Sequence, residues 1–319
     1  MEEIAASSGS LSVFVNGGTT PLGRALVRRL VTAGHRVTAT VSDSVEAGLL
    51  RQDGALPSYP DLTRAGELRS AVAASKSTVF VNLAPTYPNQ PPQGVSDWDT
   101  GLQLVSKGTT AAIEAAKATD VEFFIQGSFS FLGGDEHDHG EHEPPTAPFI
   151  DEARLAEERV EQSGLNACIL RFGFVYSAES PALQALRQAL LRGRRVMLGS
   201  THTRANWIQA EDGAQALALA IAQRPVGETL YIVDDQPATP ADFVRTLADA
   251  LGVSVPAQLP ALAQRVFASE TQLALLEQPS GASNVEAKER LGWTLQYPTM
   301  ARGLDRALLT WRALEPIRA

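Results

Sequence analysis

Cysteine is nearly absent from this sequence. Cys168 is the only one among 319 residues, so the chain cannot form an internal disulfide. It lies in the apolar run NACILRF, which indicates a buried structural thiol rather than a nucleophile. No apolar run comes near the length of a membrane span, and the first residues, MEEIAASSGS, have neither the basic nor the apolar part of a secretion signal. We expect a cytoplasmic protein without membrane contacts.

Basic charge is also scarce. The 27 Lys and Arg residues are outnumbered by 36 Asp and Glu residues, which gives a net charge of -9. No basic stripe interleaved with aromatic residues is present, so the composition argues against a nucleic-acid partner. Hydrophobic residues make up 44% of the chain, which is enough for one large core or for one core with a smaller lobe.

The stretch VFVNGGTTPLG, residues 13–23, is the most informative part of the chain. Its apolar start predicts a buried strand, its glycines predict a tight turn, and the apolar spacing in the following ALVRRLVTAG predicts a helix. Gly34 ends that helix and HRVTATVSD, residues 35–43, predicts a second strand, which closes a βαβ unit. Such a turn directs free N–H groups and the positive end of the helix dipole to one point, where a pyrophosphate fits.

Gly17, Thr20 and Gly23 follow the spacing G-x-x-G-x-x-G, with a threonine at the middle glycine whose hydroxyl offers a phosphate donor. Together with later segments as far as residue 312, this motif resembles the extended and atypical short-chain dehydrogenase/reductases. The resemblance implies an α/β fold, a Rossmann-type doubly wound parallel sheet with a smaller C-terminal substrate lobe. It divides the chain into a disordered N-terminus (1–10), an NADP-binding domain (11–177) and a mainly substrate-binding lobe (178–319), from which residues 203–235 return to the first domain.

The expected cofactor preference depends on the end of the second strand. Ser42 is a small donor that tolerates a 2′-phosphate and Arg24 offers a second phosphate contact, whereas Asp43 works against this preference. Asp61-Leu62 resembles the family's pair at the adenine edge, and the alternative is that Asp61 caps the helix starting near Thr63. The resemblance places NADP(H) contacts at Gly17, Thr19, Thr20, Pro21, Leu22, Arg24, Ser42, Asp61, Leu62, Leu83, Ala84, Arg154, Phe172, Gly173 and Phe174.

The family's catalytic residues are only partly present. Ser128 matches the catalytic serine, whose hydroxyl donates to a substrate carbonyl and stabilises its developing charge; a turn-forming serine is the alternative. The Y-x-x-x-K pair, in which lysine lowers the pKa of the phenol, is missing from the segment PPTAPFIDEARLAEERVEQSG. The pair becomes Phe149 and Ala153 in one register, or Ile150 and Arg154 in the other. Arg154 can anchor ribose hydroxyls, but it cannot supply a proton near neutral pH.

Three further segments are expected near the site. The irregular loop from Pro85 to Trp98 is expected to supply Thr86 and Tyr87 as substrate contacts. LNACILRFGFVYS resembles the family's sixth strand, which implies that the backbone of residues 172–175 meets the nicotinamide amide. The acidic segment DEHDHGEHE, residues 135–143, contains three histidines, which are possible metal ligands. Its glycine and alternating charges give no rigid scaffold, so we expect no metal. Asp212 is expected to cap the helix that follows it.

The resemblance implies an NADPH-dependent ketoreductase of antibiotic biosynthesis, because some tyrosine-less members reduce aromatic polyketides. A ketone beside a phenol can take its proton from its own hydroxyl or from water, so the protein need only donate hydrogen bonds and exclude solvent. The alternative is a non-catalytic dinucleotide-sensing regulator, which is favoured by the missing tyrosine and by Val105 at the place of the family's asparagine. The expected partner is a small aromatic ketone. Monomer and homodimer both remain open, with helices near 100–117 and 151–163 as a dimer face.

Overall fold

The structure is a computed structural model, and it describes residues 9–84, 95–133, 147–196, 201–255, 275, 278 and 280–314. Some sequence-based predictions lie outside these ranges. They are the disorder of residues 1–8, the substrate contacts Thr86 and Tyr87, and the histidine-containing segment 135–143.

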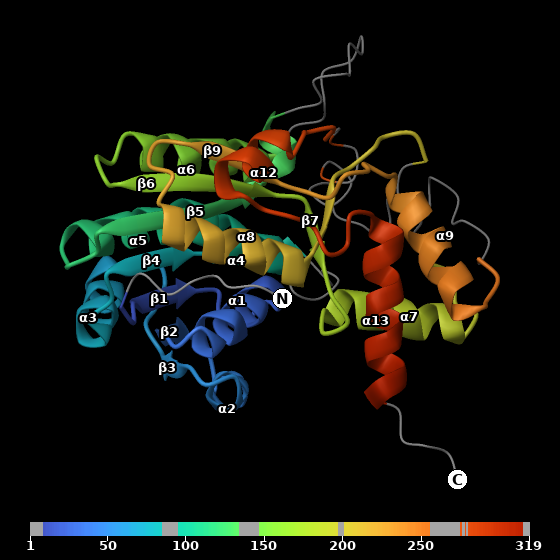
Figure 1. Cartoon of the computed structure of the whole chain (residues 1–319), viewed down its shortest axis with the longest axis horizontal. Helices are drawn as coiled ribbons and strands as arrows, with labels where there is room; N and C mark the ends of the chain where they lie inside the picture. The colour runs from blue at the N-terminus through green and yellow to red at the C-terminus, as the bar shows by residue number, and fades with distance from the viewer. Residues whose placement is uncertain are drawn as a thin grey trace.

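Within the described residues, seven parallel strands form the main sheet in the order β3-β2-β1-β4-β5-β6-β9 (Figure 1). The strands are β1 (Ser12–Asn16), β2 (Arg36–Thr40), β3 (Leu56–Ser58), β4 (Val79–Asn82), β5 (Phe123–Phe129), β6 (Ala167–Phe172) and β9 (Thr229–Ile232). The order reverses between β1 and β4, and doubly wound sheets bind ligands at the carboxyl ends of the strands that flank such a reversal. The predicted fold class is confirmed.

Helices cover both faces of this sheet (Figure 1). One face carries α1 (Pro21–Thr32), α2 (Ser44–Gln52), α8 (Ala210–Gln223) and α12 (Val285–Leu291), and the other carries α3 (Ala65–Ser75), α5 (Thr109–Lys117) and α6 (Pro148–Glu161). Side chains alternate along each strand, so Val13 and Val15 join the first core while Phe14 joins the second. A strand buried on both faces reads as a continuous apolar run, which explains VFV in β1 and again in β4.

The helix before β5 begins earlier than the sequence predicted. It runs from α4 (Val95–Gln103) through a π-helical turn (Leu104–Gly108) into α5. The prediction that the loop extends to Trp98 is therefore wrong. The prolines and the glycine that indicated a loop all precede Val95, and nothing from 95 to 100 breaks a helix.

A smaller lobe lies beyond the carboxyl ends of the main strands (Figure 1). It contains β7 (Phe174–Tyr176), α7 (Pro181–Leu191), β8 (Trp207–Gln209), α9 (Pro240–Leu251) and α13 (Met300–Leu314). Trp207 stacks on Phe243 with ring centroids 4.3 Å apart, and the indole of Trp311 donates to the Ala178 carbonyl at 2.9 Å. The later residues 285–293 pack into the core of the main sheet through Ala287, Leu291 and Trp293. The chain therefore crosses between the two cores several times.

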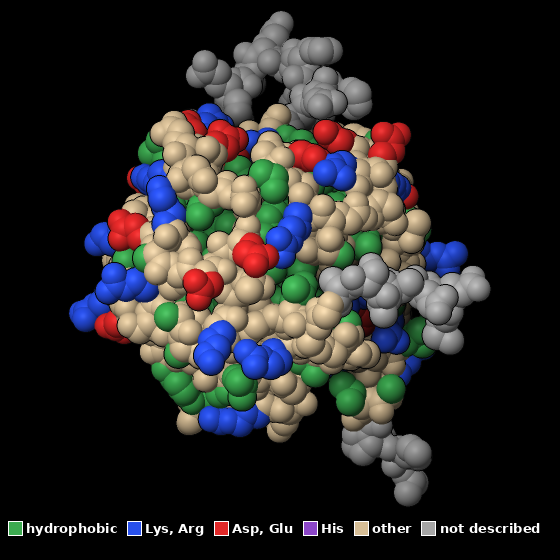
Figure 2. Space-filling view, turned by 60° about the vertical axis from the view of Figure 1, so that its left-hand side comes forward, with side chains coloured by type: hydrophobic (Ala, Val, Ile, Leu, Met, Phe, Trp, Pro, Cys, Tyr) green, Lys and Arg blue, Asp and Glu red, His purple; other side chains and the backbone are tan. Residues whose placement is uncertain are grey.

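The thiol of Cys168 lies in β6 with 2% of the residue exposed. Burial raises the pKa of this thiol to about 12, which confirms the interpretation as a structural cysteine. Basic and acidic side chains are interspersed on the face drawn in Figure 2. Among the described helices, none is long and apolar enough to cross a membrane.

Candidate active site

The glycine-rich turn is closed by direct backbone contact. Gly17 has a φ of +75°, and a Cβ on it would lie 2.7 Å from the carbonyl oxygen of Leu83. A Cβ on Gly23 would lie only 2.1 Å from the carbonyl oxygen of Gly17. The two glycines therefore allow the turn, the start of α1 and the end of β4 to touch. This brings the predicted contacts Leu83 and Ala84 next to the turn.

Thr20 stabilises the turn instead of offering a donor to a phosphate. Its hydroxyl donates to the Gly17 carbonyl at 2.8 Å and accepts from the Gly23 N–H at 3.0 Å, so it is the N-cap of α1. The predicted phosphate contact from this hydroxyl is therefore wrong, because its proton is already used. Pro21 has no N–H, and within the described residues the N–H groups of Thr19 and Leu22 bind no protein acceptor. These two groups remain for an anion at the helix N-terminus.

Arg24 lies away from the end of the second strand. Its guanidinium makes a two-pronged contact with Asp53, at 2.7 and 3.0 Å, and this bond is the largest cause that raises the pKa of Arg24. Asp53 follows the C-terminal end of α2, whereas Ser42 precedes its N-terminal end, about 13 Å away along a nine-residue helix. Arg24 therefore cannot reach a 2′-phosphate at Ser42 while it binds Asp53, which corrects that prediction.

Ser42 is also engaged within the protein. Its N–H and its hydroxyl both donate to the Glu46 carboxylate at 2.7 Å. The neighbouring Asp43 is the N-cap of α2 and accepts from the N–H groups of Val45 and Glu46. A ligand group can use the Ser42 donors only by displacing Glu46.

Asp61 holds the turn that precedes α3. Its carboxylate accepts from the N–H and the hydroxyl of Thr63, at 2.9 and 2.7 Å, and the hydroxyl bond is the main cause that lowers the pKa of Asp61. The helix itself starts only at Ala65, with Arg64 at the N-cap position. The alternative that Asp61 caps the helix is therefore wrong, because its carboxylate binds Thr63 in the turn before the helix. Leu62 packs against the core beside α3 and α5.

Ser128 lies near the carboxyl end of β5, with 6% of the residue exposed. Within the described residues its hydroxyl has no protein partner, so it is free to donate. The preceding Gly127 stands where the family has a serine, and a Cβ there would lie 2.9 Å from the Leu83 side chain. The close approach of Leu83 explains the glycine.

The structure of α6 distinguishes the two alignments considered for the missing Y-x-x-x-K pair. Phe149 and Ala153, one turn apart, are each 2% exposed and face inward, and the Phe149 ring lies 5.3 Å from that of Phe129 in β5. Arg154 is exposed on the outer part of the helix. The first register is therefore the one that faces β5, and the ribose contact predicted for Arg154 is not supported by its position.

A buried ion pair fixes α6 on the sheet, and sequence reasoning missed it. Arg171 in β6 binds Glu157 in α6 at 2.6 and 3.0 Å, and it donates to the Tyr231 hydroxyl in β9 at 2.7 Å. Burial would lower the pKa of Arg171, but the Glu157 carboxylate outweighs it, so the pKa is raised. Arg171 is the strand neighbour of Ser128. The pair thus anchors the helix beside the candidate catalytic serine.

The backbone of residues 172–174 has little left to donate. The Gly173 N–H binds the Ile232 carbonyl at 3.2 Å, and the Phe174 N–H binds the Asn206 carbonyl at 2.8 Å. Phe172 itself is a core residue. A contact from Gly173 or Phe174 to a nicotinamide amide would have to use carbonyl oxygens, which accept from its NH₂ group.

Three buried amides, also missed from the sequence, cross the carboxyl ends of β1, β4 and β5. Asn16 donates to Asn82 at 3.2 Å, Asn82 to Gln126 at 3.0 Å, and Gln126 to the Gly127 carbonyl at 2.8 Å. The Gly127 carbonyl can only accept, so it fixes the direction of all three hydrogen bonds, which we call the amide ladder. The ladder ends at Asn16 Oδ1, which has no partner although Asn16 is 1% exposed. An unused acceptor therefore lies at the reversal of strand order, beside Gly17.

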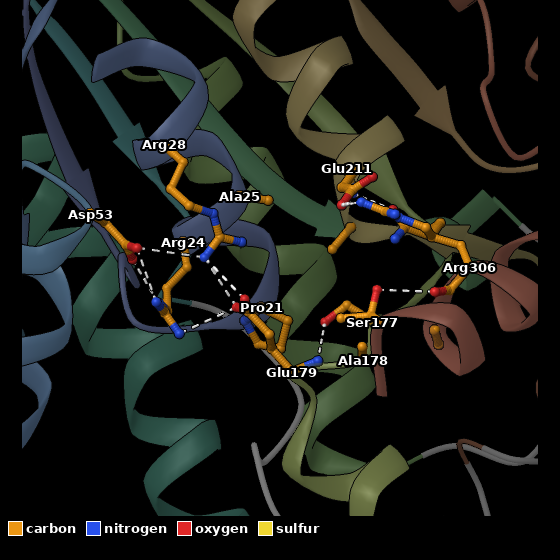
Figure 3. A pocket seen from close by; sticks show the side chains of 14 residues that line it. Pro21, Arg24, Ala25, Arg28, Asp53, Ser177, Ala178, Glu179, Glu211 and Arg306 are labelled. Atoms are coloured by element: carbon orange, nitrogen blue, oxygen red, sulfur yellow. Dashed lines mark hydrogen bonds and ion pairs between the residues drawn. The ribbon is translucent and has the colours of Figure 1, made fainter. Parts of the chain in front are cut away.

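A cavity of about 370 Å³ lies along the outer side of α1, between it and the smaller lobe (Figure 3). Its charged side chains are paired: Arg24 with Asp53 and Glu179, Arg28 with Glu179, and Arg306 with Glu211. Since each charge already has a partner, we interpret this cavity as a charged junction between the lobes. Among the predicted site residues that the structure describes, only Pro21 and Arg24 line it.

Asp212 has a different role from the expected one. Its carboxylate accepts from the N–H groups of Gln296 and Tyr297, at 2.8 and 2.9 Å, while the cap of α8 is the Gln209 side chain. The prediction that Asp212 caps its helix is wrong, because it already lies inside the first turn. No group of three metal-ligating side chains occurs among the described residues.

Comparison with known proteins relates this arrangement to dinucleotide-binding proteins. A family model described as NAD(P)H-binding matches residues 17–206. A 3-diazoavenalumate denitrifying reductase from a Streptomyces species is 25% identical over 93% of this chain and 100% of its own length. The photosystem II assembly factor Ycf39 of Cyanophora paradoxa is 30% identical over 50% of this chain, which spans 44% of that protein.

Among solved structures, the UDP-glucose 4-epimerase of Thermotoga maritima, solved with UDP-glucose, superposes with a TM-score of 0.76 at 18% identity. The match covers 95% of this chain and 99% of that one. The UDP-glucose 4-epimerase of Thermus thermophilus in complex with NAD has a TM-score of 0.75, also at 18% identity and with the same coverage of 95% and 99%. At this identity the likeness establishes the fold alone.

Proposed function

Because the chain belongs to the NAD(P)H-binding family, we propose that it is an NADPH-dependent reductase of a ketone in an aromatic polyketide or a similar secondary metabolite. The proposed activity is that of an enzyme like the angucyclinone ketoreductase of simocyclinone biosynthesis. The observation that carries this function is the Ser128 hydroxyl near the end of β5, which has no protein partner among the described residues. Phe149 and Ala153 stand at the places of the family's tyrosine and lysine.

The residues of the turn fit a dinucleotide. Gly17 and Gly23 leave room for backbone that any Cβ would fill, and the N–H groups of Thr19 and Leu22 are free for a pyrophosphate. When bound, NADPH supplies the hydride. Ser128 donates to the carbonyl oxygen and stabilises the negative charge that develops there.

The two places of the family's tyrosine and lysine offer no proton for the reduction of a ketone. Phe149 and Ala153 have no exchangeable proton, and Arg154 points outward. A phenol beside the ketone, or water, would supply it, while the buried Phe129, Phe131 and Phe149 help to exclude bulk solvent.

The Streptomyces relative favours a second candidate function, the reductive removal of nitrogen from a diazo arene. Hydride that replaces the diazonium group of an arene gives the arene and N₂, so no proton donor is needed. A site without a tyrosine would suffice for this chemistry. A third candidate, a dinucleotide sensor without turnover, is favoured by the same missing residues.

The preference for NADPH stays a prediction. Ser42 suggested it, yet both Ser42 donors bind the Glu46 carboxylate, which would repel a 2′-phosphate. Thermal melting with NADPH, NADH or neither decides the question, because a cofactor at 100 times its Kd adds about 2.7 kcal/mol of stability.

The test of the proposed function is nucleotide consumption with three substrates: an angucyclinone-type ketone, the same ketone without its neighbouring phenol, and an arenediazonium. We expect turnover of the first, which Ser128→Ala lowers by on the order of a hundredfold without changing the cofactor-induced rise in melting temperature. Ser70→Ala, on the exposed side of α3, serves as the matched control.

Turnover of the arenediazonium alone would replace the ketone by the diazo arene. A rise in melting temperature with no turnover of any of the three would leave the sensor. Full activity of Ser128→Ala would remove the serine from the mechanism.

A further inference from the structure

Residues 280–284 form hydrogen bonds to residues at the ends of three strands, β5, β8 and β9. Ser280 contacts Ser130, just beyond β5, with 2.9 Å between the two hydroxyl oxygens. Ser280 and Ala282 bind Asn206, which directly precedes β8. Asn284 donates to the Val233 carbonyl, just after β9, at 2.8 Å. Residues 280–284 therefore join strand ends that are far apart in the sequence.

The orientation of the Asn206 amide is fixed by backbone groups that can act in one sense only. Its Oδ1 accepts from the Ala282 N–H at 3.0 Å, and its Nδ2 donates to the Ala282 carbonyl at 3.2 Å. Ser280, whose oxygen lies 2.6 Å from the same Oδ1, must therefore be a donor to it. The Ser130 oxygen is a second acceptor for the same Ser280 hydroxyl, at 2.9 Å, so the single Ser280 proton faces both Asn206 and Ser130.

These hydrogen bonds distinguish the two serines of the segment Gly127–Ser130. The Ser130 oxygen is held by the Ser280 hydroxyl, whereas the Ser128 hydroxyl has no partner among the described residues. Ser128 is therefore the serine that we assign to the substrate. Ser130 instead fixes the end of β5, two residues beyond the reacting position.

The backbone of Asn206 also contacts the chain just after β6. The backbone carbonyl of Asn206 accepts from the Phe174 N–H at 2.8 Å, and a Cβ on Gly173 would lie 2.8 Å from the same oxygen. The three side chains are buried, with 0% of Asn206, 1% of Ser280 and 3% of Ser130 exposed. Buried hydrogen bonds of this kind restrict the movement of the groups that they join.

We infer that Asn206, Ser280 and Ser130 form a latch that positions the ends of β5 and β6 relative to each other for hydride transfer. The latch rests on the proposed function, since it acts through Ser128 on the substrate side and through Gly173–Phe174 on the cofactor side. Its members are positioning residues and touch neither reactant. A displacement of about 1 Å between the reacting groups is enough to lower a rate strongly.

The test compares Ser280→Ala with Ser280→Thr, which keeps the hydroxyl, and with Ser283→Ala as the matched control. Ser283 is exposed in the same segment and contacts only the Val285 N–H, at 3.3 Å, among the described groups. For Ser280→Ala we expect kcat to fall on the order of tenfold with KM and the cofactor-induced melting shift unchanged. Ser280→Thr is expected to recover most of kcat, and Ser283→Ala to match the wild type.

Hydrogen exchange of the Phe174 and Ala282 amides, measured without substrate, judges the latch independently of turnover. We expect faster exchange at both amides in Ser280→Ala and wild-type exchange in Ser283→Ala. If the wild-type protein reduces nothing but Ser280→Ala loosens both amides, the reductase is rejected and the latch stands. Unchanged exchange, or a destabilised Ser280→Ala variant with full kcat, would overturn the latch.

Discussion

At the scale of single residues, the turn after β1 depends on the absence of a side chain at Gly17 and Gly23. Gly23 lies at the first turn of α1 directly beneath the Gly17 carbonyl, and its missing side chain lets the helix start at that point. The middle position of the motif tolerates a side chain, because the Thr20 hydroxyl bonds to the Gly17 carbonyl and to the Gly23 N–H and so caps α1. The threonine therefore changes the means of closing the turn and keeps its shape.

Gly23→Ala is expected to abolish cofactor binding and to lower stability by several kcal/mol. A Cβ 2.1 Å from the Gly17 oxygen cannot be accommodated unless the turn opens. Thermal melting with and without NADPH or NADH measures both effects. Gly66→Ala, in the first turn of α3 where nothing lies within 4 Å of the added Cβ, is the control and should melt within a few degrees of the wild type. A Gly23→Ala protein that still gains stability from the nucleotide would show that the turn can rearrange.

At the scale of strands and helices, the amide ladder joins β1, β4 and β5 by side chains as well as by backbone. Each member follows an apolar run, VFV in β1 and β4 and FFI in β5, and points to the face that bears α3 and α5. The ladder thus ties together the three strand ends that surround the reversal of strand order.

Asn82→Leu is expected to reduce the free energy of unfolding by roughly 2–4 kcal/mol, because it leaves both Asn16 Nδ2 and Gln126 Oε1 without partners in the core. Denaturant unfolding measures the change. Asn166→Leu removes an exposed amide that donates to the Glu122 carbonyl at 3.3 Å, and it should change stability by no more than about 0.5 kcal/mol. Equal losses in the two variants would mean that the ladder adds nothing beyond a surface hydrogen bond.

Local sequence patterns predicted helices and strands but not the side-chain contacts between them. Periodicity and glycine spacing act within a few residues, and they predicted the βαβ start. The resemblance to a known family supplied the doubly wound parallel sheet and the place of Ser128. The ladder was missed because Asn after an apolar run looks like a turn former, and its meaning depends on β1 pairing with β4. Arg24 was misplaced for the same reason: its partner Asp53 is 29 residues away in sequence.

At the scale of the whole molecule, the two lobes meet at a set of buried carboxylates. Asp234 follows β9 and is 2% exposed, and its Oδ2 has no partner among the described residues. Asp212, on α8, binds the backbone of residues 296–297 just before α13. Burial is the main cause that raises the pKa of Asp234, to about 8, and it also raises the pKa of Asp212.

Stability should therefore decline as the pH rises toward 8. The folded chain keeps a proton on Asp234 that the unfolded chain releases above its ordinary pKa of about 3.9, so each pH unit in between costs stability on the order of 1 kcal/mol. Asp234→Asn cannot ionise and keeps an acceptor for the Gln236 N–H. Its stability should be close to that of the wild type near pH 4 and clearly higher at pH 8, as measured by urea unfolding across that range.

Asp249→Asn, which removes a carboxylate at an exposed position of α9, is the control for this prediction. It should keep the wild-type slope of stability against pH. A wild-type curve that runs parallel to that of Asp234→Asn would show that Asp234 is ionised in the folded protein throughout.

The amide ladder has one more consequence, for spectroscopy. Its amides point head to tail and polarise one another, so a donor that reaches Asn16 Oδ1 strengthens the bonds down the line. The side-chain NH₂ signals of Asn82 and Gln126 then form a built-in NMR reporter. They would register occupancy of the crevice from inside the core, even for a ligand that the protein binds but never transforms.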